Sequence, residues 1–217
     1  MNKIKIGIII PDRSDRPEFL KNCLRMIGNQ TMRADIIELV DDLPINDRCD
    51  ITWRYRIGYD RLRNKELDCI LLMENDDWYS PTYIETMVNK WVKAGKPEII
   101  GTNYTIYYHI GINKHFTMNH QLRASAMNTL LKPDLNFNWP VDHEPYTDLH
   151  LWKTLKGHTF KPEEIISIGI KHGVGLCGGR NHNCSFHRYI NDDSNGSFLI
   201  ENMDTESLFF YTKQYDT

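Results

Sequence analysis

The first half of the chain alternates between short apolar runs and segments in which apolar residues recur with helical spacing. This alternation predicts strands that are each followed by a helix, an order that builds a mostly parallel sheet with helices on both faces. The expected strands cover residues 3–10, 34–40, 67–73 and 99–110. The expected helices cover residues 17–29, 55–65 and 81–94. We therefore predict an α/β fold, in which ligands bind beyond the carboxyl ends of the strands.

The second half of the sequence is less regular. We expect in it a hairpin or strand pair, a helix and a further strand, at residues 116–130, 142–155 and 165–170. No internal repeat, low-complexity tract or linker divides the sequence. The chain is therefore predicted to form a single domain over residues 1–217, in which residues 101–217 close over residues 1–100.

Composition narrows the class of protein. The formal net charge of −3 gives no global basic field for nucleic acid, although a local basic patch stays open. No apolar run approaches the ~20 residues that cross a bilayer, and no small-residue cleavage site follows the short apolar start. The five cysteines are odd in number and scattered, which favours reduced thiols and a cytoplasmic, intracellular setting.

An acidic cluster follows the third expected strand, in the stretch LLMENDDWYSP. Glu74, Asp76 and Asp77 would repel one another there, and the pKa of each carboxyl would rise if the charges stayed uncompensated. A hard cation such as Mg²⁺ or Mn²⁺ resolves this, because it takes carboxylate oxygens together with nucleotide phosphates. The alternative is a solvated acidic turn, with Ser80 capping the next helix.

Three motifs in this order resemble GT-A-fold glycosyltransferases, particularly the family-two group. They are IIIPDRSDRPEFLKNCLRMIGNQT, LVDD and LLMENDDWYSP, which together lie within about the first 95 residues. The resemblance implies a Rossmann-like GT-A domain that binds a nucleotide sugar through its first half, with the acceptor and catalytic groups in its second half. Glu74 stands where the family usually has Asp, so direct metal contact shifts toward Asp76.

The resemblance implies an Mn²⁺ or Mg²⁺ cofactor and a nucleotide-diphosphate sugar, most simply a UDP-sugar. The residues that would contact the nucleotide sugar by this resemblance are Pro11, Asp12, Arg13, Asp41, Arg61, Asn75, Asp76 and Trp78. Each position also has a plainer interpretation. Asp41, for which Asp42 is a substitute, can be a turn acid, the two arginines can be surface charges, Asn75 can be a spacer and Trp78 can be core.

A second acidic motif carries the expected catalytic base. The segment YTDLHLWKTL resembles the family's E-D-x-x-L-x-x-R segment at Asp148, although Thr147 and Lys153 replace the usual acid and arginine. The resemblance implies that this carboxylate takes the proton of the acceptor hydroxyl, and that one displacement inverts the anomeric carbon. Asp142 and Glu144 are nearby alternatives, and Asp148 can also serve only as a helix-start charge.

The glycine- and histidine-rich segment 171–187 has three interpretations. By resemblance, His172 or His182 supplies a further metal ligand, while Lys171 or Arg180 meets the charge of a diphosphate. A zinc site is the second interpretation, with ligands drawn from Cys177, His182, Cys184 and His187, although the spacing is not a common zinc pattern. The third is a surface loop.

The predicted function is a metal-dependent, inverting glycosyltransferase. The acceptor is either a saccharide or glycolipid, or a hydroxymethylated pyrimidine in DNA of the kind that compact bacteriophage enzymes modify. A basic surface would favour DNA, and its candidates are Lys90, Lys93, Lys96, Lys114, Arg123 and Lys132. A nucleotidyltransferase and a non-catalytic nucleotide- or sugar-binding module are the alternatives. The sequence does not indicate an oligomeric state.

Overall fold

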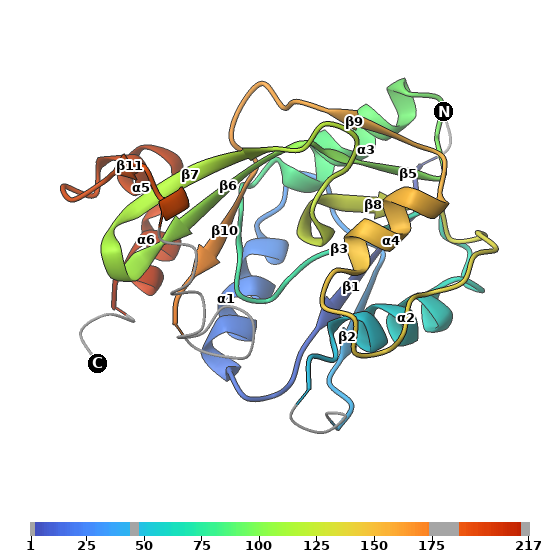
Figure 1. Cartoon of the computed structure of the whole chain (residues 1–217). Coiled ribbons are helices and arrows are strands. Elements are labelled where there is room, and N and C mark those ends of the chain that lie inside the picture. Colours follow the sequence, from blue (N-terminus) through green and yellow to red (C-terminus); the bar gives the residue numbers. More distant parts are fainter. Residues whose placement is uncertain (1–2, 44–47, 174–186, 214–217) are drawn as a thin grey trace.

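The computed structural model describes residues 3–43, 48–173 and 187–213, and these residues form two β-sheets with helices around them (Figure 1). The first sheet has the strand order β2-β1-β3-β8-β5-β9. Its strands are β1 (Ile6–Pro11), β2 (Ile36–Val40), β3 (Cys69–Leu72), β5 (Ile99–Thr102), β8 (Thr129–Leu131) and β9 (Gly157–Phe160). The pairs β1–β2, β1–β3 and β5–β9 are parallel, and β8 is antiparallel to both of its neighbours.

The helices cover both faces of this sheet, as the sequence predicts. They are α1 (Pro17–Gly28), α2 (Ile51–Leu62), α3 (Tyr83–Lys93), α4 (Thr147–Thr154), α5 (Ser197–Asn202) and α6 (Thr205–Lys213). Successive strand residues alternate between two cores because side chains in a strand point to opposite faces. Ile8 and Leu71 pack with α1 and α3, whereas Ile9 and Leu72 pack with α2 and α4. The apolar runs of β1 and β3 are therefore buried on both faces.

The second sheet has the order β11-β7-β6-β10-β4 and lies beside the first. Its strands are β4 (Trp78–Tyr79), β6 (Tyr104–His109), β7 (Lys114–Asn119), β10 (Ser167–Lys171) and β11 (Asn191–Asp192). Two short 3-10 helices, η1 (Ile110–Ile112) and η2 (Ala126–Asn128), follow β6 and precede β8. Figure 1 shows the long β6–β7 hairpin curving away from the first sheet toward α5 and α6.

The expected strand at residues 99–110 is wrong as one element, because the chain bends at Asn103 and becomes β5 in one sheet and β6 in the other. The Tyr104 N–H donates to Thr102 Oγ1 at 3.1 Å, a local bond at the point where the chain passes from one sheet to the other. Residues 116–130 likewise divide between β7 and β8, which lie in different sheets. Strand β9 and the helical character of α5 and α6 were not predicted.

Strands from both halves of the sequence share each sheet. Strands β8 and β9 complete the sheet that β1 to β3 begin, and β4 joins the sheet that the later strands build. One apolar core spans the two sheets, since Ile8 and Leu71 cluster with Ile106 and Ile168. In the described part of the chain, no helix combines the length and the apolar character that a bilayer span requires.

Candidate active site

The acidic residues lie where the chain leaves the first sheet and enters the second, between β3 and β4. Two hydrogen bonds from backbone N–H groups fix the start of this acidic turn, residues 73–77. The Met73 N–H donates to the Ile9 carbonyl oxygen at 3.0 Å, and the Glu74 N–H donates to Tyr79 Oη at 2.7 Å. The turn is therefore held at the carboxyl end of the central parallel strands, where α/β sheets bind ligands.

Glu74, Asp76 and Asp77 converge within the turn, and one carboxylate oxygen from each lies within 4.8 Å of the others. Burial, followed by the charge of Asp76, raises the pKa of Glu74 to about 7. Burial and the charges of Glu74 and Asp76 also hold the pKa of Asp77 well above its usual range. Full ionisation of the three carboxyls together is therefore unfavourable, and a bound cation would favour it.

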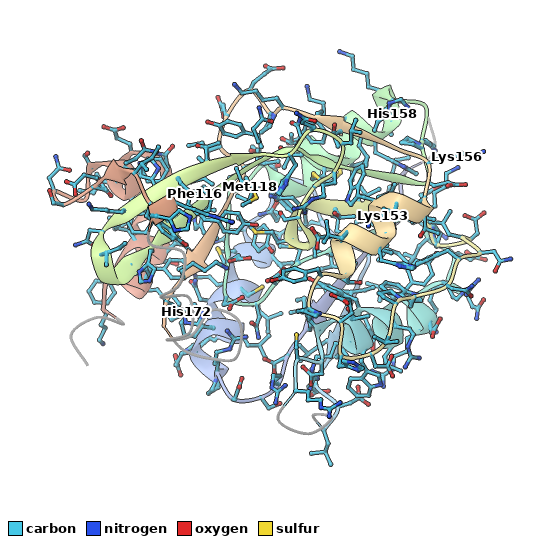
Figure 2. The ribbon with its side chains drawn as sticks, in the orientation of Figure 1. Phe116, Met118, Lys153, Lys156, His158 and His172 are labelled. Atoms are coloured by element: carbon cyan, nitrogen blue, oxygen red, sulfur yellow. The ribbon has the colours of Figure 1, made fainter. Side chains whose placement is uncertain are left out.

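Asp76 is the member of the cluster that is held ionised. Its Oδ2 lies 2.5 Å from Arg16 Nη1 and 2.9 Å from His172 Nε2. Burial alone would raise the pKa of Asp76, but the Arg16 guanidinium and the His172 ring hold it well below its usual range. The His172 side chain is fully buried, and the centre of its ring lies 4.3 Å from the centre of the Phe19 ring on α1. Figure 2 labels His172. The structure thus brings the predicted ligands Asp76 and His172 together.

Asn75 is more than a spacer. Its Nδ2 donates to Asp12 Oδ1 at 2.6 Å, and its Oδ1 accepts from Arg16 Nη2 at 3.1 Å. Asp12 follows β1, and its backbone N–H donates to the Val40 carbonyl oxygen at 3.0 Å. This buried network joins the carboxyl ends of β1 and β3, so the predicted residues Asp12, Asn75 and Asp76 form one site.

Lys171, the last residue of β10, supplies a second positive charge beside the turn. Burial would lower its pKa, but the carboxylates of Asp77 and Glu74, together with the hydroxyl of Tyr107, hold it above its usual value. Its Nζ also lies 5.1 Å from the centre of the Tyr107 ring. Lys171 therefore stays charged next to the acidic cluster.

The expected catalytic base lies close enough to the cluster for its charge to act on Glu74. Asp148 lies in the first turn of α4, only 13% of its side chain is exposed, and its charge raises the pKa of Glu74. Burial raises the pKa of Asp148 itself, while an ion pair with Arg123 opposes the rise. A buried carboxylate with a raised pKa is suited to accept a proton.

The two alternative bases are engaged elsewhere. Both oxygens of Asp142 accept from Arg56 of α2, at 3.0 and 3.1 Å. Glu144 Oε1 accepts from the Tyr146 N–H at 3.0 Å, which shapes the loop before α4. The Asp148 side chain is 13% exposed against 44% for Asp142, and the Asp148 charge acts on Glu74.

The structure does not bring every predicted contact residue to the cluster. Arg13 Nη1 lies 3.0 Å from Asp50 Oδ1, and Arg61 forms ion pairs with Glu38 and Asp42. Trp78 is 2% exposed within the core, and its indole N–H donates to Asp204 Oδ2 at 3.2 Å. Pro11 is the buried last residue of β1, and Asp41 is exposed just after β2.

Two predictions lie wholly or partly outside the described residues. His182 as a metal ligand is one of them. The zinc interpretation is the other, since of its four residues only His187, which is exposed, is described. Arg180 also falls outside the described ranges.

Sequence reasoning did not assign Arg16, although the motif around it was noted. The signal for Arg16 is its position directly before Pro17, which starts a helix after the first strand and so places the arginine at the carboxyl edge of the sheet. The basic residues suggested for a DNA surface are spread over α3, β7 and three loops, and Arg123 is paired with Asp148.

No protein-family model matches the sequence, and no curated protein does. Among solved structures, A197 from STIV is 14% identical, with a TM-score of 0.50 over 73% of this chain and 82% of that one. TarS 1–349 from S. aureus in complex with UDP is 10% identical, with a TM-score of 0.52 over 77% of this chain. The complex of TarS 1–349 with UDP-GlcNAc is 11% identical, with a TM-score of 0.51 over 81% of this chain.

The chain spans 60% of the length of TarS 1–349 in both of these comparisons. The neighbours are GT-A glycosyltransferases, and at such low identity the likeness establishes the fold alone. The predicted fold class is therefore confirmed: an α/β architecture of the GT-A type, with a mostly parallel sheet between helices.

Proposed function

We propose that this chain transfers a sugar from a nucleotide-diphosphate sugar, most simply a UDP-sugar, to an acceptor hydroxyl, with inversion at the anomeric carbon. One observation carries the proposal. Three carboxylates converge at the carboxyl edge of the parallel strands, in a fold shared with a protein whose structures hold UDP and UDP-GlcNAc. Such an edge is where α/β sheets bind nucleotides.

The donor set suits Mn²⁺ or Mg²⁺. The cluster offers hard oxygen ligands from Glu74, Asp76 and Asp77, and burial together with the charge of Asp76 raises the pKa of Glu74, so a cation would favour its ionised form. A cation held there, with His172 as a further ligand, would stabilise the negative charge that develops on the diphosphate leaving group. The metal requirement and its ligands are part of the proposal.

Asp148 is the proposed base. The acceptor hydroxyl oxygen attacks the anomeric carbon, the bond from that carbon to the diphosphate oxygen breaks, and the hydroxyl proton passes to Asp148. Arg123 holds the carboxylate through its ion pair, which fixes its orientation. Because a single displacement occurs, the configuration at the anomeric carbon inverts.

The distribution of charge supports one of the two acceptor classes over the other. The chain carries a net charge of −3, and the basic residues suggested for a DNA surface are scattered and partly paired, as with Lys90 and Glu163 at 3.5 Å. Since DNA binding depends on a contiguous basic surface, a saccharide or glycolipid is the favoured acceptor. Hydroxymethylated DNA is the second acceptor to test.

The test is a panel of UDP-, GDP- and other nucleotide sugars with Mn²⁺ or Mg²⁺, followed by thermal stabilisation and slow donor hydrolysis. We expect one UDP-sugar to stabilise the chain and to be hydrolysed only with metal present. Stabilisation without turnover on any acceptor would indicate a binding module. Release of pyrophosphate from a nucleoside triphosphate would indicate a nucleotidyltransferase. No response to any nucleotide would overturn the proposal.

A further inference from the structure

Arg16 is held more tightly than an ordinary loop arginine. Its guanidinium contacts Asp76 Oδ2 at 2.5 Å, Asn75 Oδ1 at 3.1 Å and His172 Nε2 at 3.3 Å. Only 14% of the side chain is exposed, and the ring of Phe19 lies 5.9 Å away. The guanidinium therefore occupies the acidic cluster from the side of α1.

The position of Arg16 conflicts with a metal ion on the same carboxylate. Arg16 Nη1 and His172 Nε2 both approach Oδ2 of Asp76, whose carboxylate converges with those of Glu74 and Asp77. A divalent cation within a few ångströms of a guanidinium is repelled by it, and the repulsion is strong where water is excluded. The Asp76 carboxylate can therefore pair closely with the arginine or bind the metal, but the two interactions oppose each other.

Another observation indicates that the Arg16 guanidinium could bind an anion in place of Asp76. Its buried Nε makes no hydrogen bond among the described residues and has only the exposed Asp15 carboxylate near it, with Oδ1 at 3.5 Å, so the guanidinium has an N–H that Asp76 and Asn75 do not satisfy. Arg16 is also the residue before the first turn of α1, at the carboxyl edge of β1 and β3. An anion at this edge would meet both the helix start and a planar group suited to phosphate.

We infer that Arg16 is an exchangeable counter-ion: it pairs with Asp76 in the ligand-free chain and passes to the donor diphosphate when a divalent cation takes Asp76. The inference rests on the proposed function and adds a role for a residue that the motif comparison leaves unassigned. It implies that metal and nucleotide diphosphate bind with positive coupling. The diphosphate draws the Arg16 guanidinium away from Asp76, which lowers its repulsion of the metal, and the metal frees Arg16 to bind the diphosphate. Coupling of this kind is reciprocal between the two ligands.

Arg16→Gln tests the exchange by binding alone, with calorimetric titration of Mn²⁺, of UDP, and of Mn²⁺ at saturating UDP. Because the competing cation is gone, we expect Mn²⁺ alone to bind about tenfold more tightly than to the native chain. Because the diphosphate loses its arginine, we expect UDP with Mn²⁺ to bind about tenfold more weakly. The factor by which UDP strengthens Mn²⁺ binding should fall accordingly.

Two further variants separate the exchange from a structural role. Arg33→Gln removes an exposed arginine that donates to the Gly28 carbonyl oxygen, and it should bind both ligands as the native chain does. Arg16→Lys keeps the charge but loses the planar fork, so its coupling factor should lie between those of the native chain and Arg16→Gln. Circular dichroism and thermal melting establish that each variant is folded.

The outcomes are distinct. Native-like Mn²⁺ affinity and native-like coupling in folded Arg16→Gln would overturn the inference, as would weaker binding of Mn²⁺ alone. If Arg16→Gln does not fold, an unchanged coupling factor in Arg16→Lys overturns it instead. A native chain that binds neither Mn²⁺ nor any nucleotide would count against the proposed function itself.

Discussion

Asp77 Oδ1 accepts a hydrogen bond from the backbone N–H of Ile170 at 2.8 Å, which ties the acidic turn to β10 of the second sheet. Both residues are buried, with Asp77 2% and Ile170 1% exposed. One carboxylate thus has two tasks. One of its oxygens joins the sheets, and it also belongs to the cluster that would hold a cation.

Replacement of Asp77 should separate these two tasks. Asp77→Ala leaves the Ile170 N–H buried without its acceptor, and we expect a loss of about 1–3 kcal/mol in the free energy of unfolding. Asp77→Asn keeps an acceptor oxygen and removes a charge that burial disfavours, so it should cost far less stability while still weakening Mn²⁺ binding. Urea denaturation and Mn²⁺ titration measure the two effects. Equal destabilisation by both variants would show that the hydrogen bond from Ile170 to Asp77 does not stabilise the fold.

Replacement of Asp148 should stop transfer and spare donor binding. Asp148→Asn retains an oxygen for Arg123 but cannot take the acceptor proton, so we expect transfer to fall by about 10²–10⁴-fold with a nearly unchanged donor dissociation constant. Initial rates and nucleotide titration provide the measurement. Asp142→Asn is the matched control, since both oxygens of Asp142 are bound by Arg56, and its transfer rate should change little. Unchanged transfer in Asp148→Asn would rule this residue out as the base.

Metal binding should depend on pH through Glu74. Burial and the charge of Asp76 raise its pKa to about 7, above its ordinary value of 4.5, so this carboxyl is largely protonated in the metal-free chain below that pH. A cation must displace the proton, and we expect Mn²⁺ affinity to rise from pH 5.5 through 7 and to level off about one pH unit above that pKa. Calorimetric titration across this range measures the profile. Glu74→Gln should bind Mn²⁺ weakly and with a flatter profile, and a native profile flat below pH 7 would contradict the assignment.

The same raised pKa predicts how the metal-free chain responds to pH. A carboxyl that is harder to ionise in the folded state contributes full stability only below its unfolded pKa, and this contribution declines as the pH rises toward the folded value. We therefore expect the metal-free chain to lose stability between about pH 4.5 and pH 7 through this residue. Thermal melting should show a smaller decline in Glu74→Gln. Identical pH profiles in the two chains would contradict the prediction.

The packing of β5 should make Gly101 intolerant of a side chain. A Cβ at Gly101 would lie 2.4 Å from Ala124 Cβ and 2.5 Å from the Asn128 carbonyl oxygen. Since a backbone oxygen cannot swing away, Gly101→Ala should destabilise the fold by about 1–3 kcal/mol. Gly28→Ala, where no atom lies within 4 Å, should be neutral or stabilising by up to about 1 kcal/mol. Chemical denaturation of the two variants tests the contrast.

The parts predicted well from sequence are those that local patterns determine. The run of apolar residues in β1 and the helical spacing of Phe19, Cys23 and Ile27 in α1 depend on neighbours in sequence. The acidic motif could be placed at the end of a buried strand in the same way, whereas Asp76 was chosen within it by family resemblance and its role as a metal ligand stays a prediction. The likeness to GT-A structures confirms the fold that these patterns implied.

The parts that were missed depend on contacts between distant segments. Nothing near Tyr104 indicates that the chain changes sheets there, and β8 can be placed between β3 and β5 only once the whole sheet is known. Trp78 follows the acidic motif, and its sequence position suggests that it could contact a ligand. Its indole N–H instead donates to Asp204, which lies 126 positions later in the sequence. A role for Arg16 becomes evident only in the folded chain, where its guanidinium contacts Asp76 and His172.

The Tyr211 hydroxyl of α6 donates to the backbone oxygen of Asp76 at 3.3 Å, across 135 positions of sequence. During synthesis, the ribosome therefore makes the acidic turn long before it makes the helix that packs beneath it. A nascent chain that has emerged only as far as β10 lacks this support for Asp76, so the site acquires its final geometry late. Competence to bind a ligand would then mark the completion of folding and not its start.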